Sequence, residues 1–329
     1  MNCNNEHVFY DKGITEFSKS TIAIGFPGQG PHQPDKMSRL IREHPVAVDV
    51  FREAEEILER PVLPLLLEER GFESTTRDNQ VRLYLGSSAL WLAAQTEGIA
   101  PVGQKNIFFG ASAGEYAALM AAGAYDFATG LSLIDARGEE MHKASIINPG
   151  EMLIASGLPF EEAKKIAKGF PGVYAVNDNP GMQTVFSGTA VGIRALSEHL
   201  SDSEIWGGVR LDWPAIREAA HSWHMSPAVK GFSKTLRNAK IKKPPYDFMG
   251  NQAKVLRSAR STKKHLAAQL TRGVLLTESA RQMREDFGVD TFVDVGPGKV
   301  LLSQMRRQFR KSVRLISIVD ELLPEKNSE

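Results

Sequence analysis

Cysteine is almost absent from this chain, because Cys3 is the single one among 329 residues. A lone cysteine excludes an intrachain disulfide and any metal site built from several thiolates. Cys3 stands in a polar N-terminal stretch, so we do not expect it to be catalytic. The sequence therefore predicts neither a redox centre nor a metal site.

Long hydrophobic runs are also absent. No stretch approaches the roughly 18 consecutive apolar residues typical of a membrane-spanning helix. The N-terminal residues contain Asp11 and Glu16 and lack the apolar segment of a signal peptide. We therefore expect a cytoplasmic protein with no membrane partner.

The chain has no excess of charge of either sign, since 40 Lys and Arg residues balance 39 Asp and Glu residues. This balance argues against a nucleic-acid partner. Two local basic clusters remain, and each is either a solvated surface or a docking surface for an acidic protein. They are Lys240, Lys242 and Lys243, and Arg306, Arg307, Arg310 and Lys311.

Phosphate-binding loops are missing as well. Gly296-Pro-Gly-Lys299 ends in lysine, but Val300 stands where a magnesium-binding Ser or Thr is required. Gly25-Phe-Pro-Gly-Gln-Gly30 lacks the G-x-G-x-x-G spacing. Both loops thus argue against nucleotide binding.

Several short apolar runs are present, and they end at glycine before helix-like stretches. The runs predict strands at Thr21–Phe26, Asn106–Gly110 and Thr291–Val295, and a helix over 113–122. Strand, glycine turn and helix in this order are typical of a parallel α/β sheet.

The pattern changes between residues 150 and 213. It predicts strands at 152–156, 173–176 and 184–187 and helices at 159–168 and 191–200. This order resembles a small ferredoxin-like α+β unit. We therefore predict an α/β-hydrolase-like larger unit with a parallel sheet, formed by 20–149 and 214–318, and a smaller inserted unit at 150–213.

Gly110-Ala-Ser-Ala-Gly114 fits G-x-S-x-G, the nucleophile elbow. The chemistry needs a serine on a sharp strand-to-helix turn, where the helix N-terminus favours developing negative charge. The apolar strand before it and the helix-forming stretch after it favour this interpretation. The alternative is a glycine-rich turn with an inert serine.

Further motifs follow one another along the chain. They are Phe26-Pro-Gly-Gln-Gly30, Gly110–Leu119, Arg137-Gly-Glu-Glu-Met141, Asn177–Gly188, His221–Ala228 and Val293–Leu301. In this order and spacing the chain resembles the malonyl-CoA:acyl carrier protein transacylase family, which includes polyketide synthase acyltransferase domains. Gly110–Leu119 matches the family's G-H-S-L-G-E-Y-A-A-L at eight of ten positions.

The resemblance implies roles for individual residues. Ser112 would be the nucleophile, and His221 the general base that activates it and then protonates the leaving thiol. His224 is the alternative base, but the family motif favours His221. The backbone carbonyl of Gln269 would orient the His221 ring, in place of the acidic residue of a hydrolase triad.

The same resemblance implies groups that bind the substrate. Backbone N–H groups of Gln29 and Ala113 would form the oxyanion hole. Arg137 would pair with the free carboxylate of a malonyl group, which calls for a fixed guanidinium fork. Asn177 would line the acyl pocket.

Three alanines depart from the family pattern around the reacting centre. Ala111 and Ala113 flank the serine, and Ala220 precedes the catalytic histidine. They predict a pocket wide enough for a substituted malonyl group, unless neighbours such as Trp213 and Trp223 fill the space. The charged pair Arg217–Glu218 either reads a polar acyl substituent or faces solvent, and we expect solvent.

The resemblance thus implies an acyltransferase that moves a malonyl or substituted-malonyl group from CoA to the phosphopantetheine thiol of an acyl carrier protein. It implies fatty-acid or polyketide-type biosynthesis, favouring the latter, a monomer, and no cofactor beyond the acyl-CoA donor. An acyl hydrolase acting on carrier proteins and a non-catalytic carrier-protein docking module are the alternatives.

Overall fold

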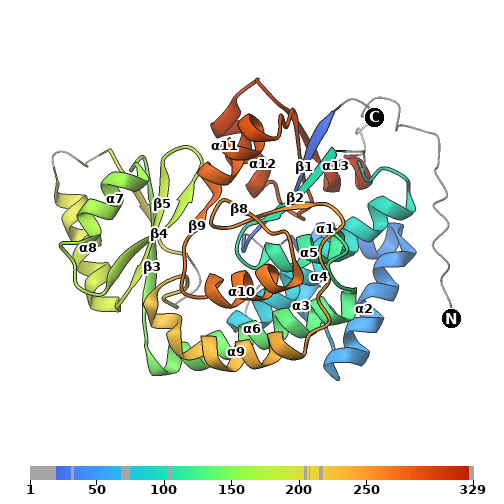
Figure 1. Cartoon of the computed structure of the whole chain (residues 1–329), viewed down its shortest axis with the longest axis horizontal. Coiled ribbons are helices and arrows are strands. Elements are labelled where there is room, and N and C mark those ends of the chain that lie inside the picture. Colours follow the sequence, from blue (N-terminus) through green and yellow to red (C-terminus); the bar gives the residue numbers. More distant parts are fainter. Residues whose placement is uncertain are drawn as a thin grey trace.

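The computed structural model describes residues 20–30, 33–67, 75–101, 105–203, 206, 208–214 and 218–325. Cys3 and Arg217 lie outside these residues. Two sheets organise the described chain, and they lie side by side in Figure 1.

The first sheet has six strands in the order β11-β10-β1-β2-β7-β8. All neighbours are parallel except β8, which is antiparallel to β7. The strands are β1 (Thr21–Phe26), β2 (Lys105–Gly110), β7 (Asp247–Gly250), β8 (Lys254–Val255), β10 (Thr291–Asp294) and β11 (Arg314–Ser317). Every residue of the central β1 is buried, as expected for a parallel strand covered on both faces. The predicted strand at Thr21–Phe26 is confirmed.

Two hydrophobic clusters cover the opposite faces of this sheet. Ile22 and Ile24 pack with most of the helices, whereas Ala23 between them packs with residues of α11 and α12. Helices on the first face are α1 (Pro34–Glu43), α2 (Pro45–Leu58), α3 (Leu63–Leu67), α4 (Thr76–Thr96), α5 (Gly114–Ala121), α6 (Phe127–Ile147), α9 (Ser226–Asn238), α10 (Ala259–Gln269) and α13 (Ile318–Leu322). On the second face lie α11 (Leu276–Asp286) and α12 (Val300–Phe309).

The second sheet has five strands in the order β6-β3-β5-β4-β9. They are β3 (Glu151–Ser156), β4 (Val173–Asn179), β5 (Gln183–Gly188), β6 (Arg210–Asp212) and β9 (Val274–Leu275), with helices α7 (Phe160–Ala167) and α8 (Ala190–Asp202) packed against them. The first four strands are antiparallel, and with the two helices they follow the βαββαβ order of a ferredoxin-like unit.

The strand β9 is a fifth strand of the second sheet that lies outside the predicted range of the smaller unit, 150–213. It comes from the chain assigned to the larger unit and pairs in parallel with β4. A strand of two residues has too little periodicity to be recognised alone. The two units therefore share a sheet across the site described below.

Side-chain caps explain why the longest helices begin where they do. Thr75 caps α4 in a capping box with Asp78, and Asp126 caps α6 by accepting from the Thr129 N–H. In the described part of the chain, no helix is long and apolar enough to cross a membrane.

Candidate active site

Ser112 occupies the turn between β2 and α5. Its φ of 50° is left-handed, a conformation that residues with a side chain rarely adopt. Gly114 follows where the chain passes close to β1: a Cβ there would lie 2.3 Å from the carbonyl oxygens of Phe26 and Pro27. Only glycine fits this approach, so the glycine of the motif is what allows the turn to present Ser112.

His221 reaches Ser112 from the turn before η2 (Trp223–Met225). Its Nε2 lies 2.7 Å from Ser112 Oγ. Its Nδ1 lies 3.0 Å from the carbonyl oxygen of Gln269 and 3.1 Å from that of Arg272. Because carbonyls only accept, Nδ1 carries the proton and Nε2 is left to accept the hydrogen of the serine hydroxyl.

The surroundings of His221 keep its ring uncharged. Burial, and secondly the nearby Arg137 guanidinium, lower the pKa of His221 from 6.5 to about 4. At neutral pH the imidazole is therefore neutral and able to take a proton from Ser112.

His224, the alternative base, occupies a different place. Its Nε2 lies 3.1 Å from the carbonyl oxygen of Gly172, and its own carbonyl accepts from the Asn148 side chain. It ties η2 to the smaller unit and makes no contact with Ser112.

Arg137, on α6, is 1% exposed and projects beside the nucleophile. Its Nη2 donates to Ser112 Oγ at 3.2 Å and its Nε to Gln269 Oε1 at 3.1 Å, while Nη1 donates to Gln80 Oε1. A guanidinium has five N–H donors, so one donor on each terminal nitrogen remains. Such a pair matches the two oxygens of a carboxylate.

Gln29 and Ala113 both line the cavity in front of Ser112. Neither backbone N–H donates to an acceptor within the described residues. Both donors are therefore available to an oxygen placed beside the serine.

The cavity has a volume of about 550 Å³ and lies between the two sheets. Each predicted site residue lines it except Gln269, which is fully buried behind Ser112. Ala111, Ala113 and Ala220 form the wall near the reacting centre, and Asn177 faces them from β4. Apolar side chains complete the wall: Met141, Met152, Ile154, Val185 and Val274.

The side chains named as the alternative to a wide pocket do not fill this space. Trp213 is 51% exposed and Trp223 is 63% exposed, and neither lines the cavity. The expectation that Glu218 faces solvent is wrong, because Glu218 is 5% exposed. Burial raises the pKa of its carboxyl group, which a nearby Thr76 hydroxyl partly offsets.

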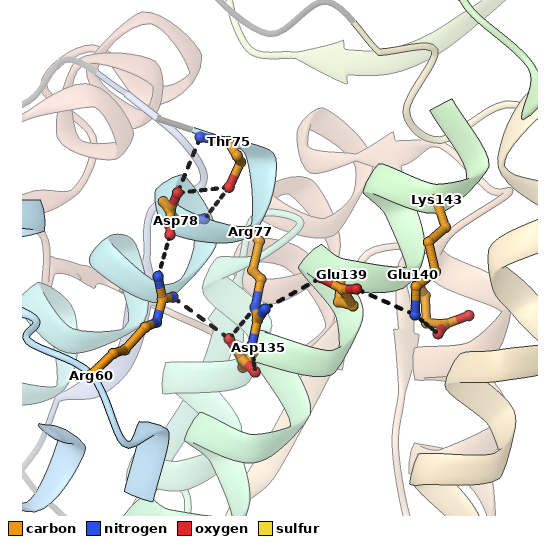
Figure 2. Close-up of polar contacts among 8 residues, drawn as sticks. All are labelled: Arg60, Thr75, Arg77, Asp78, Asp135, Glu139, Glu140 and Lys143. Carbon is orange, nitrogen blue, oxygen red and sulfur yellow. Dashed lines mark hydrogen bonds and ion pairs between the residues drawn. The ribbon is translucent and has the colours of Figure 1, made fainter. Parts of the chain in front are cut away.

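An ion-pair network holds α4 against α6 next to the Gln80–Arg137 contact (Figure 2). Arg77 binds both oxygens of Asp135 at 2.7 Å, and Arg60 binds Asp78 at 2.7 Å. Arg77 and Gln80 lie on successive turns of α4, and Asp135 and Arg137 lie two residues apart near the middle of α6. The network therefore fixes the two helices that carry this contact.

Four residues of the site have no role in the sequence prediction: Gln80, Glu115, Asn251 and His265. Glu115 belongs to the motif around Ser112, and this motif could have identified it as a residue of the site. Asn251 accepts from the Ser112 N–H at 2.7 Å and donates to the Gly110 carbonyl at 2.6 Å. No sequence pattern marks Asn251, Gln80 or His265, because their partners are distant in the chain. Among the described residues, no group of His, Cys, Asp or Glu side chains is arranged to hold a metal ion.

Comparison with known proteins shows the family of the chain. Residues 25–328 match the acyl transferase domain family. The malonyl CoA-acyl carrier protein transacylase of Bacillus subtilis is 31% identical over 307 residues, covering 92% of this chain and 94% of the relative.

Solved structures share the fold. The malonyl CoA-acyl carrier protein transacylase of Coxiella burnetii superposes with a TM-score of 0.84 at 25% identity, covering 93% of this chain and 96% of that one. A malonyl-transacylase solved in complex with a type II polyketide synthase acyl carrier protein superposes with a TM-score of 0.81 at 26% identity, covering 92% and 99%.

Proposed function

The chain belongs to the acyl transferase family, and we propose that it transfers a malonyl-type acyl group from coenzyme A to an acyl carrier protein through an ester on Ser112. The observation that carries this proposal is that a base and a cation meet at the oxygen of one serine. Ser112 Oγ lies 2.7 Å from His221 Nε2 and 3.2 Å from Arg137 Nη2.

The reaction runs in two matched halves. His221 Nε2 takes the hydroxyl proton while Ser112 Oγ attacks the thioester carbonyl. The C–S bond then breaks, and His221 returns the proton to the departing CoA thiolate. In the second half, the phosphopantetheine thiol of the carrier protein gives its proton to His221 and attacks the acyl-serine. The ester C–O bond then breaks, and His221 returns the proton to Ser112 Oγ.

Other groups bind the negative charges of the substrate and of the tetrahedral intermediates. The Gln29 and Ala113 N–H groups stabilise the oxyanion of each tetrahedral intermediate, a contribution of about 3 kcal/mol per donor. Arg137 holds the free carboxylate of the acyl group. Acyl-CoA is the donor substrate, and the proposed reaction needs no further cofactor. We place this monomeric enzyme in the cytoplasm.

Intact mass spectrometry tests the proposal. Incubation with malonyl-CoA should give a malonyl adduct that is absent from Ser112→Ala and that disappears when a phosphopantetheinylated carrier protein is added and becomes malonylated. Turnover to free malonate without transfer would identify an acyl hydrolase. Absence of any adduct would identify a docking module.

The alanine-lined wall supports a substituted-malonyl donor and, with it, polyketide-type biosynthesis. A phenyl group at position 220 would occupy the space beside His221. We therefore expect Ala220→Phe to lower acylation by a methyl- or ethyl-substituted malonyl-CoA while acylation by malonyl-CoA is retained. If the wild type accepts only malonyl-CoA, the wider-pocket part of the proposal is refuted.

The basic cluster at the C-terminal end of α12, which continues two residues past the helix, supports a docking site for an acidic carrier protein. Arg306, Arg307, Arg310 and Lys311 are exposed, whereas Gln304 on the same helix lines the cavity. Arg307 also lies over Gly181 of the β4–β5 turn. Asn179 and Gln183 on either side of Gly181 line the cavity, so the cluster is adjacent to it.

A further inference from the structure

The Glu115 carboxylate lies directly behind the nucleophile and is 0% exposed. It accepts from three residues on two separate segments of the chain, one directly after β7 and the other α10. The Asn251 N–H donates at 2.8 Å, His265 Nε2 lies 2.8 and 2.9 Å from its two oxygens, and the Gln269 side-chain amide also donates to it.

Two of these partners reach the reacting groups. Asn251 Oδ1 accepts from the Ser112 N–H at 2.7 Å, and Gln269 Nε2 donates to the Ser112 carbonyl at 3.0 Å. The backbone carbonyl of Gln269 also accepts from His221. Glu115 is therefore one contact away from the residues that hold Ser112 and His221 in place.

A buried carboxylate is costly unless a cation pairs with it. His265 is that partner, with a side chain that is 6% exposed. Burial alone lowers the pKa of His265, but the attraction and hydrogen bonds of Glu115 outweigh this and raise it. Of the other nearby charges, Arg272 opposes the imidazolium, and Arg137 adds positive charge near Glu115.

The fold makes room for this histidine at the end of β7. A Cβ on residue 250 would lie 2.7 Å from His265 Cε1, so the ring fits only because that residue is Gly250. His265 lies one helical turn before Gln269 on α10, so the two side chains meet Glu115 from the same face.

We propose that His265 is a positioning residue for acyl transfer: its imidazolium balances the Glu115 carboxylate, which then holds Asn251 and Gln269 where they fix Ser112 and His221. This proposal rests on the proposed function of the same site. Without the imidazolium, the buried Glu115 carboxyl group would bind a proton. It would then donate a hydrogen bond where it now accepts one, and the contacts to Asn251 and Gln269 could not all persist.

The test compares His265→Leu and His265→Gln with the wild type and with His199→Leu, a control at an exposed histidine on α8. The rate of malonyl-serine formation should fall by about 100-fold in His265→Leu at neutral pH, as for a small misplacement of reacting groups. Gln donates a hydrogen bond but carries no charge, so the rate in His265→Gln should lie between those of the wild type and His265→Leu. Both variants should gain activity as pH rises, because Glu115 ionises again. This dependence is expected to be absent from the wild type and the control.

A thermal unfolding curve for each variant confirms that the chain is folded. Wild-type rates in folded His265→Leu, or a loss of rate that does not change with pH, would overturn the proposal. A wild type that forms no acyl-serine would instead refute the proposed function.

A second measurement needs no variant. Nitrogen-15 NMR of the histidine rings, with His265 assigned through its contacts to Gly250, should show both ring nitrogens protonated at neutral pH. A neutral His265 ring at that pH would also overturn the proposal.

Discussion

The two reacting side chains are carried by residues with unusual backbone angles. Ser112 has a φ of 50° and His221 a φ of 62°. Left-handed angles are costly for residues with a side chain and persist where the surroundings impose them. Here those surroundings are the close approach at Gly114, the Asn251 contacts and the two carbonyls facing His221. The site is thus built before substrate arrives.

Arg137 should discriminate between acyl groups by their charge. Arg137→Ala removes two charged hydrogen bonds to a malonyl carboxylate, and such bonds contribute about 1.5–3 kcal/mol each. We expect acylation by malonyl-CoA to fall by about 100-fold or more, with a much smaller effect on acetyl-CoA. Arg137→Lys should resemble the alanine variant because lysine lacks the fork. Equal losses with both donors, measured by intact mass over time, would disprove the carboxylate contact.

The pH dependence of the serine should follow His221. Its folded-state pKa of about 4 lies below the ordinary 6.5, so the base remains active down to low pH. The rate at which a fluorophosphonate labels Ser112 should therefore fall only as pH decreases through about 4. Protonation is also linked to stability: between these two pKa values the unfolded chain binds more protons at this residue, so its contribution favours unfolding as pH falls.

The Arg137→Ala variant tests whether the Arg137 guanidinium helps to lower the pKa of His221. Removing the guanidinium removes one of the two effects that lower the pKa of His221. The acidic limb of the labelling profile should then move to higher pH. An unchanged limb would show that burial alone sets the value.

At the scale of elements, α4 and α6 act as one support. Their N-terminal caps are local, but their mutual position depends on Arg77 and Asp135, which are far apart in sequence. Figure 2 shows how Arg60 and Asp78 extend this contact to the start of α4. Gln80 and Arg137, which meet in the cavity, thus depend on contacts that lie outside it.

Asp135→Asn should therefore affect both stability and loading. A partly exposed bidentate pair contributes up to about 1 kcal/mol, so the free energy of unfolding should fall by about that amount. Malonyl loading should fall modestly, since α4 and α6 carry the contact that orients Arg137. Lys143→Ala, at the exposed end of the same network, should change unfolding by less than about 0.5 kcal/mol. Urea titration measures the free energy of unfolding of both variants. Equal effects of the two substitutions would contradict the role of Asp135 in holding α6 against α4.

The elements also differ in how far they could be predicted. The strand at 21–26 and the helix at about 113–122 have strong patterns of their own, and the structure has them as β1 and α5. The strands β6 and β9 were not predicted. They have three and two residues, and pairing with β3 and β4 rather than local pattern makes them strands.

At the scale of the whole molecule, the position of the cavity explains how two substrates use one serine. The second sheet forms one side of its wall, the loops that follow β1 and β2 form the other, and α12 adds Val300 and Gln304. The two basic clusters lie at different ends of the larger unit. Lys243 lines a groove with Thr21 and Lys105, at the amino ends of β1 and β2, whereas Ser112 follows the carboxyl end of β2.

Charge reversal on α12 should affect the second half of the reaction alone. Arg307→Glu with Arg310→Glu should raise the KM for the carrier protein by about tenfold or more, through lost attraction and added repulsion. The rate of acyl-serine formation from malonyl-CoA should be unchanged. Lys240→Glu with Lys243→Glu is the matched control and should leave transfer intact. The α12 effect should weaken as salt rises, and equal effects of both double variants would exclude this docking site.

The sequence by itself determined the local chemistry: the Ser112 turn, the strands with strong patterns of their own and, through the family motifs, His221 and Arg137 as candidates. Each of these features depends on residues that are neighbours in the chain, so a short motif or a hydrophobic periodicity is enough to predict it. Only the tertiary structure decided that Asn251, Gln80 and the Glu115–His265 pair come together around Ser112 and Arg137. Their contacts join segments that are far apart in sequence, where packing, burial and charge pairing act without leaving a local pattern.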